Sequence, residues 1–90
     1  MVIEYEDRYR IELEGRLTSH LELLAATENV LMHLENEDDG GLIALGYSVE
    51  RIARIKALDG EGGKTFCKTV AKGLSVDIAK IREVMDDIRQ

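Results

Sequence analysis

The chain has 90 residues, and its 12 lysines and arginines against 18 aspartates and glutamates give a formal charge of −6 at pH 7. This length predicts one domain over residues 1–90, and a composition that is 44% apolar and 33% charged is typical of a folded globular chain. The negative charge argues against a nonspecific binder of nucleic acid or anionic membrane, because both activities depend on a summed positive potential.

The first predicted element lies within residues 2–38. Between residues 3 and 17 apolar and charged side chains alternate, which is the period of a half-buried strand. The same stretch places a glutamate four residues before an arginine three times, a spacing that stabilises a helix. The three pairs are Glu4–Arg8, Glu6–Arg10 and Glu12–Arg16. No second convincing strand follows for pairing, so we favour helix and keep a strand over residues 2–17 as the alternative.

A second helix-start signal lies inside this element. Ser19 and Glu22 have the spacing of a capping box, after which the apolar pattern continues as far as Leu34. Either one helix runs to about Leu34, or the chain bends near residues 15–19.

Eight glycines and no proline divide the rest of the chain. Gly46 interrupts an apolar stripe within residues 42–58, and Ser48 is a candidate N-cap just after it. Glycines within residues 60–63 predict a connection between helices. Gly73 predicts another boundary, with Ser75 as the N-cap of a last helix over residues 75–89. The predicted fold class is all-α: a small three- to four-helix bundle with a long N-terminal helix.

The chemical motifs of the chain are incomplete. Residues 62–65 resemble the end of a phosphate-binding loop, but that motif needs a glycine where this chain has Leu58. Residues 35–40 resemble the start of a calcium loop, but the closing glutamate of such a loop is replaced by Gly46. We therefore expect no catalytic residues, no metal and no cofactor.

Residues 45–56 resemble the turn and recognition helix of helix-turn-helix proteins. The candidate DNA-binding residues are Arg51, Arg54 and Lys56. The first helix of such a motif would begin within residues 38–41, whose two aspartates and two glycines are predicted to make a poor helix. A DNA-binding transcriptional regulator is therefore the alternative function.

The sequence EYEDRYRIEL at residues 4–13, followed by Leu17, resembles the first helix of epsilon antitoxins, which are small acidic three-helix proteins. The resemblance implies that the chain neutralises a zeta toxin, a kinase that phosphorylates a UDP-N-acetylated amino sugar with ATP. It also implies that the N-terminal helix blocks the ATP site of the kinase, in an assembly of two antitoxins and two toxins.

The charge distribution is compatible with such a role. Residues 1–50 hold 12 acidic and 3 basic side chains, whereas residues 51–90 hold 6 and 9. An acidic helix is attracted to the electropositive cleft of an ATP-binding protein, and tyrosines can anchor it there. The candidate partner-binding residues are Tyr5, Glu6, Tyr9, Arg10, Glu12 and Leu13. In the other interpretations the tyrosines only cover the apolar end of a bundle, or the chain is a homodimeric helical scaffold.

Cysteine content and the N-terminal sequence predict a cytoplasmic location. Cys67 is the single cysteine, so no intrachain disulfide can form. The first residues are acidic where a secretory signal is basic and then apolar, and no stretch approaches the ~18 apolar residues of a membrane span. We expect a protein partner, suspected to be a toxin kinase, or a second copy of the chain, and no membrane.

Overall fold

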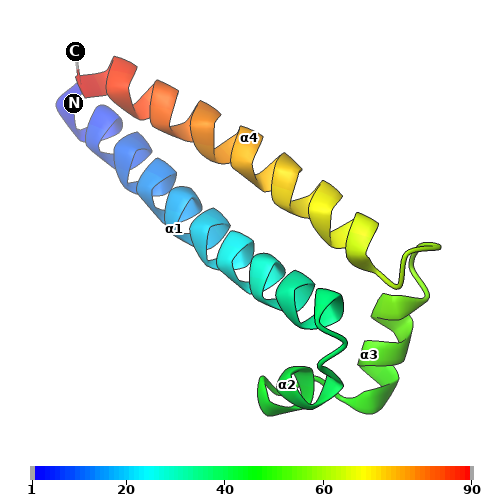
Figure 1. Cartoon of the computed structure of the whole chain (residues 1–90). Coiled ribbons are helices and arrows are strands. Elements are labelled where there is room, and N and C mark those ends of the chain that lie inside the picture. Colours follow the sequence, from blue (N-terminus) through cyan, green and yellow to red (C-terminus); the bar gives the residue numbers. More distant parts are fainter. Residues whose placement is uncertain (1, 90) are drawn as a thin grey trace.

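The computed structural model describes the backbone of residues 2–89 and the side chains of residues 8–88. It contains four helices, α1 (Val2–Glu35), α2 (Asp39–Ala44), α3 (Val49–Lys56) and α4 (Lys64–Arg89), and the described backbone has no strand (Figure 1). The prediction of an all-α fold with a long N-terminal helix is confirmed. Because α1 is one helix of 34 residues, the strand alternative for residues 2–17 is wrong, and so is a bend near Ser19.

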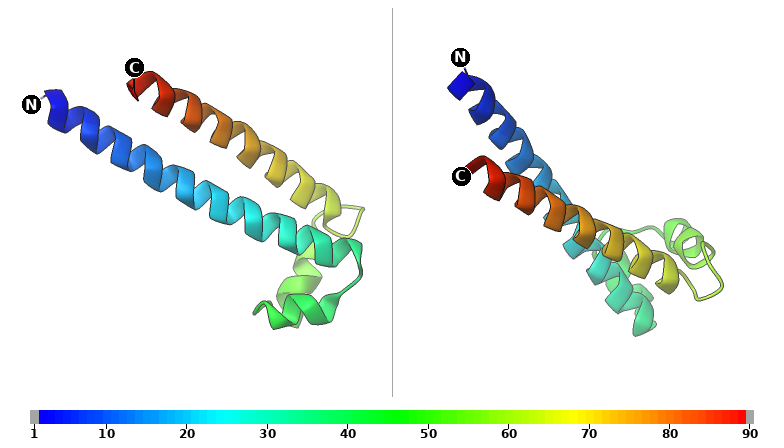
Figure 2. Two further views of the ribbon diagram at one scale, coloured as in Figure 1. Left: turned by 60° about the vertical axis from the view of Figure 1, so that its left-hand side comes forward. Right: turned by 90° about the horizontal axis from the view of Figure 1, so that it is seen from above.

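Helices α1 and α4 lie side by side in opposite directions and form a long hairpin (Figures 1 and 2). The positions at which they face each other recur in alternating steps of four and three residues, the period of a left-handed coiled coil. We call these positions the seam, and every one of them is buried or half-buried. They are Leu13, Leu17, His20, Leu24, Thr27, Leu31 and Leu34 in α1, and Cys67, Ala71, Leu74, Ile78, Ile81, Met85 and Ile88 in α4.

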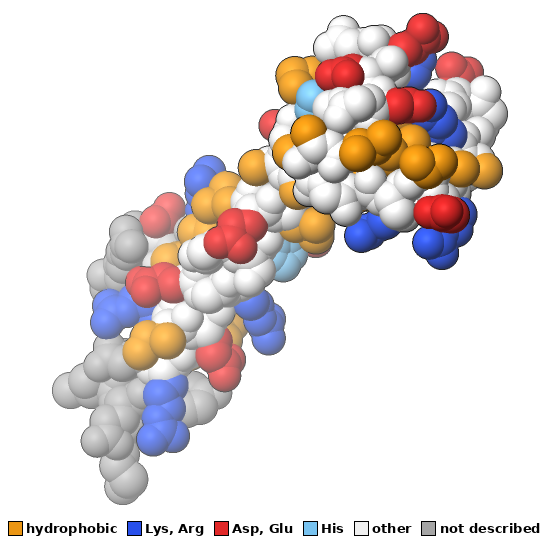
Figure 3. All heavy atoms as spheres, turned by 90° about the horizontal axis from the view of Figure 1, so that it is seen from below, with side chains coloured by type: hydrophobic (Ala, Val, Ile, Leu, Met, Phe, Trp, Pro, Cys, Tyr) orange, Lys and Arg blue, Asp and Glu red, His pale blue; other side chains and the backbone are white. Residues whose placement is uncertain are grey.

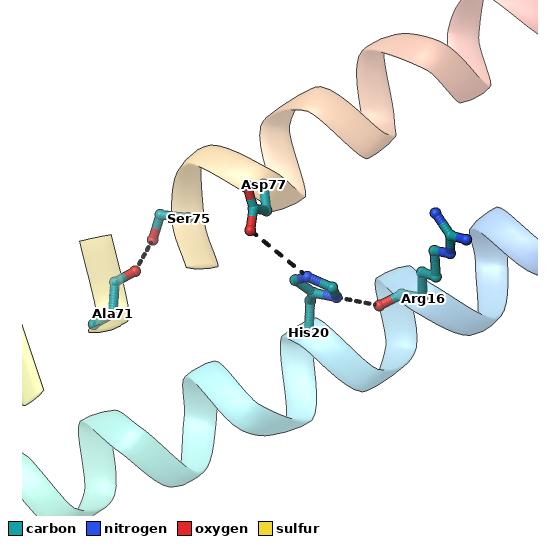
Figure 4. Close-up of polar contacts among 5 residues, drawn as sticks. All are labelled: Arg16, His20, Ala71, Ser75 and Asp77. Atoms are coloured by element: carbon teal, nitrogen blue, oxygen red, sulfur yellow. Dashed lines mark hydrogen bonds and ion pairs between the residues drawn. The ribbon is translucent and has the colours of Figure 1, made fainter. Parts of the chain in front are cut away.

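Helix α4 continues through Gly73, so the predicted boundary at Gly73 and the predicted N-cap at Ser75 are both wrong. The hydroxyl of Ser75 instead donates a hydrogen bond to the carbonyl of Ala71, one turn earlier, at 2.9 Å (Figure 4). A glycine inside a helix costs about 1 kcal/mol relative to alanine. Burial of the neighbouring seam residues Cys67 and Leu74 offsets that cost.

Helices α2 and α3 pack across the closed end of the hairpin (Figure 1). Leu42 of α2 is fully buried, and Ile52 of α3 is 4% exposed. Both belong to one apolar cluster with Val30, Leu34 and Cys67 from the hairpin. The two short helices therefore add a small core of their own to one end of the coiled coil.

Helix caps explain why the short helices form. The carboxylate of Asp38 accepts a hydrogen bond from the amide of Gly41 at 2.9 Å, and the hydroxyl of Ser48 accepts one from the amide of Arg51 at 3.1 Å. The prediction of a cap at Ser48 is confirmed. The prediction that residues 38–41 make a poor helix is wrong, because this cap and the burial of Leu42 stabilise α2.

The molecule is elongated, with principal extents of 52 × 22 × 17 Å. Its radius of gyration is 17.2 Å, against about 12 Å for a compact domain of this length. Its accessible surface is 6579 Å², whereas a compact monomer of 10.1 kDa exposes about 5300 Å². The chain thus exposes about 1300 Å² more than a compact monomer does.

Candidate functional site

The predicted partner-binding residues lie at the open end of the hairpin, in the first third of α1. Tyr5 and Glu6 belong to the helix, but their side chains lie outside the described residues. Tyr9 is 43% exposed, and Glu12 is exposed as well. Both therefore stand on the outer surface of α1, where a partner can reach them.

The other two predicted contacts are less accessible. Arg10 is half-buried, and Leu13 is 5% exposed because it is a seam residue packed toward α4. Leu13 therefore holds the hairpin together and presents little surface to a partner. Sequence reasoning missed Ile11, which is 64% exposed and is the most exposed large apolar side chain among the described residues of α1. The helical register was the signal for it, because Ile11 falls outside the seam spacing.

The predicted DNA-binding residues do not gather on one face of α3. Arg51 lies over the ring of Tyr47, with 4.9 Å from its guanidinium carbon to the ring centroid. Lys56 forms an ion pair with Asp39 of α2, with Nζ 2.7 Å from Oδ1. Because successive residues of a helix are 100° apart, Lys56 projects about 160° away from Arg54. Arg51 and Arg54 are only about 60° apart, so these two share one side of α3 while Lys56 lies on the other.

Tertiary packing creates an apolar groove of about 350 Å³ between α1, α3 and α4. Its rim includes Leu23, Leu58 and Phe66, each of which is about half exposed. Thr27, Tyr47 and Arg51 are polar residues of its lining. Sequence reasoning missed this groove because its residues come from three separate helices and share no periodicity.

A second group of exposed apolar side chains covers the α2–α3 end. Figure 3 shows apolar side chains gathered there on the face that is seen from below. Ile43, Leu45 and Val49 are 51%, 48% and 67% exposed. The apolar stripe predicted within residues 42–58 consists of Leu45, Val49, Ile52 and Ile55. Only Ile52 and Ile55 point inward, because Gly46, with a φ of 102°, turns the chain between α2 and α3.

In the loop that resembles a phosphate-binding site, backbone amides already donate hydrogen bonds to a carboxylate of the chain itself. Asp59 accepts hydrogen bonds from the amides of Glu61, Gly63 and Phe66 at 2.7, 2.9 and 2.7 Å. These bonds, led by the one from Phe66, hold the pKa of Asp59 below its usual value. The amides that would bind a phosphate at the start of α4 are thus used to hold the loop.

Two histidines contact acids across short distances. His33 Nδ1 lies 3.0 Å from Asp38 Oδ2 at the start of α2. His20 Nε2 lies 3.8 Å from Asp77 Oδ2 across the hairpin, while its Nδ1 lies 2.8 Å from the carbonyl oxygen of Arg16 (Figure 4). Within the described residues, no group of three or more His, Cys, Asp or Glu side chains could hold a metal ion.

Cys67 lies on the seam and beside the apolar groove, with 6% of its surface exposed. Burial raises the pKa of its thiol, and the nearby charge of Asp59 raises it further. The thiol is therefore protonated at neutral pH and packs as a small apolar side chain.

Comparisons with known proteins found no matching family model, no similar curated protein and no similar solved structure. Among the described residues, no helix is both long enough and apolar enough to cross a membrane.

Proposed function

We propose that this protein is a non-enzymatic helical inhibitor that binds a larger protein through the open end of α1. The observation that carries the proposal is the outer surface of that end, where Tyr9, which is 43% exposed, lies one turn before the exposed acid Glu12. Large apolar side chains on a rigid helix lose little conformational freedom when a partner covers them, so they are suited to a binding surface.

The most concrete form of this proposal is an antitoxin for a zeta-like kinase, whose ATP site α1 would block. Support comes from the resemblance of residues 4–13 to epsilon antitoxins and from the acidic N-terminal half. The continuous helix also supports it, because a rigid acidic rod can be steered into an electropositive nucleotide cleft.

Inhibition of a purified zeta-type kinase tests this form of the proposal. We expect the wild-type chain to block ATP binding, and Tyr9→Ala combined with Glu12→Lys to weaken inhibition at least about tenfold. The control is Phe66→Ala combined with Glu22→Lys, which removes an aromatic ring and reverses one acidic charge at exposed positions away from the open end. Kinase activity that is unaffected by the wild-type chain would contradict the antitoxin role.

Affinity purification from the native cell tests the broader proposal. We expect a protein to co-purify with the wild-type chain and to be lost with the Tyr9 and Glu12 double variant. A partner that is retained by this variant would place the binding surface elsewhere.

A second candidate function is DNA binding, because α2, the turn and the Ser48-capped α3 do form two consecutive short helices. It predicts retention on the upstream DNA of the gene at low salt, weakened by replacement of Arg51 and Arg54. Failure to shift that DNA at low salt would remove this candidate.

A further inference from the structure

Two rows of exposed side chains, each with two like charges, lie on one face of the hairpin. The residues that directly follow seam positions 13, 20 and 27 of α1 are Glu14, Leu21 and Glu28, which we call the acidic row. The residues that directly follow seam positions 67, 74 and 81 of α4 are Lys68, Ser75 and Arg82, which we call the basic row. All six are exposed, and a spacing of seven residues keeps each row in line along its helix.

Both rows lie on the face opposite α3. In two antiparallel helices, residues at the same heptad position beside the seam lie on the same face of the hairpin. Leu17 and Arg82 line one shallow groove on that face. Helix α3 lies on the other face, where its Ile55 and the preceding Tyr47 line the apolar groove together with Val30 of α1. The face that carries the rows is therefore open over the length of the rows.

The charges of the two rows are not used inside the described part of the chain. Glu14, Glu28, Lys68 and Arg82 make no ion pair within 4.0 Å with any described residue. Between the rows lie the half-buried seam residues Leu17 and Leu24, and Leu21 itself is 39% exposed. An apolar strip with an acidic edge and a basic edge is thus left without a partner.

We infer that a second copy of this chain covers this face and that the two hairpins form a four-helix bundle. A two-fold axis parallel to the helices places α1 of one copy against α4 of the other, so that each acidic row meets a basic row. His20 of α1 contacts Asp77 of α4, so these two residues are at the same height in the hairpin. Because the helices are antiparallel, any residue of α1 and any residue of α4 whose numbers sum to about 97 are also at the same height. The same axis keeps those levels between the copies, so Glu14 meets Arg82 of the partner copy and Glu28 meets Lys68 of the partner copy.

The spacing of the charges and the exposed area both fit this arrangement. Glu14 and Glu28 are separated by the same 14 residues as Lys68 and Arg82, so both pairs can form at once. The surface that the chain exposes beyond that of a compact monomer, about 1300 Å², exceeds the about 800 Å² that each partner buries in a standard interface. The four-helix bundle would also bury the half-exposed seam leucines, which a two-helix coil leaves partly in water.

Charge reversal tests the proposal with the full chain. Glu14→Lys with Glu28→Lys makes both rows basic, and Lys68→Glu with Arg82→Glu makes both rows acidic. We expect the wild-type chain to sediment as a dimer, and each double variant to dimerise at least about tenfold more weakly because like charges then face each other. We expect a mixture of the two double variants to form a one-to-one heterodimer in native mass spectrometry. Ion pairs inside one hairpin could not produce that association.

The control reverses two glutamates outside the rows. Glu22→Lys with Glu83→Lys changes the net charge by the same amount at exposed positions, and it should leave the dimer intact. Far-UV circular dichroism checks that each variant is helical, and added salt should weaken the wild-type dimer independently of any substitution. A monomeric wild-type chain, an unaffected dimer in both double variants, or a mixture without heterodimers would each overturn the proposal. These results do not depend on inhibition of a kinase, so this inference and the proposed function can fail separately.

Discussion

The hairpin and the α2–α3 end are stabilised in different ways. The hairpin repeats one packing motif along its length, because both long helices have seam residues in alternating steps of four and three. The α2–α3 end depends on single contacts: one fully buried leucine, two side-chain caps and several glycines with unusual backbone angles. Every positive φ in the described chain falls between Glu37 and Gly63.

This difference determines how each region should respond to substitution. A repeated seam distributes its stabilisation over many half-buried side chains, so the loss of one is partly compensated by its neighbours. The small apolar cluster at the α2–α3 end has no repeated neighbours, so the loss of one of its side chains is not compensated. Substitutions at the α2–α3 end should therefore have the larger effects, although this end is the shorter region.

Leu42 gives the largest expected effect. Leu42→Ala leaves a cavity where a fully buried side chain packed, and we expect a loss of about 2–5 kcal/mol in the free energy of unfolding. Urea denaturation followed by circular dichroism measures it. The control is Ile43→Ala, whose side chain is 51% exposed and whose loss should cost less than about 1 kcal/mol. Equal effects at the two positions would contradict the assignment of the cluster.

Substitutions at two glycines, one near the α2–α3 end and one in the hairpin, give the next largest expected effects. Gly63 has a φ of 88°, and an added Cβ would lie 2.6 Å from the carbonyl oxygen of Ile55, so Gly63→Ala should destabilise the chain by more than about 1 kcal/mol. Gly73 is inside α4 with open space around it, so Gly73→Ala should stabilise the chain by about 0.5–1 kcal/mol. Thermal unfolding of both variants checks the opposite signs. A stabilising Gly63→Ala would refute the loop geometry.

The sequence predicts the helical class and one local cap better than the features that depend on tertiary packing. The all-α class, the length of α1 and the cap at Ser48 follow from periodicity and local capping chemistry. Gly73 and Ser75 misled the prediction because single residues resemble a helix boundary, while the burial that keeps α4 continuous comes from α1. The groove beside Tyr47 could not be predicted at all, since it exists only when three helices meet.

Predictions from local sequence patterns also missed the role of Asp59. A lone aspartate before four residues rich in glycine gives no signal of the three amides that it accepts hydrogen bonds from. Its contacts span from Glu61 to Phe66, so one carboxylate organises both the loop and the first turn of α4. Local sequence predicts that a connection exists here, but it does not predict what holds the connection in place.

Asp59 gives the smallest expected effect at neutral pH and a clear one in acid. The amides of Phe66, Gly63 and Glu61 lower the pKa of its carboxyl in the folded state, so the unfolded chain binds a proton more readily. The stabilisation that Asp59 provides is then fully present above the unfolded pKa, near 3.8, and it is lost as the pH falls through the lower folded pKa.

In Asp59→Asn an amide oxygen can still accept two of the hydrogen bonds. We therefore expect a modest loss of stability at pH 7 and a flatter decline of stability in acid. Urea midpoints measured across the acid range test this, with Asp86→Asn, an exposed position in α4, as the control. If the acid decline of Asp59→Asn matched that of the wild type, the carboxylate would not be what holds the α3–α4 loop.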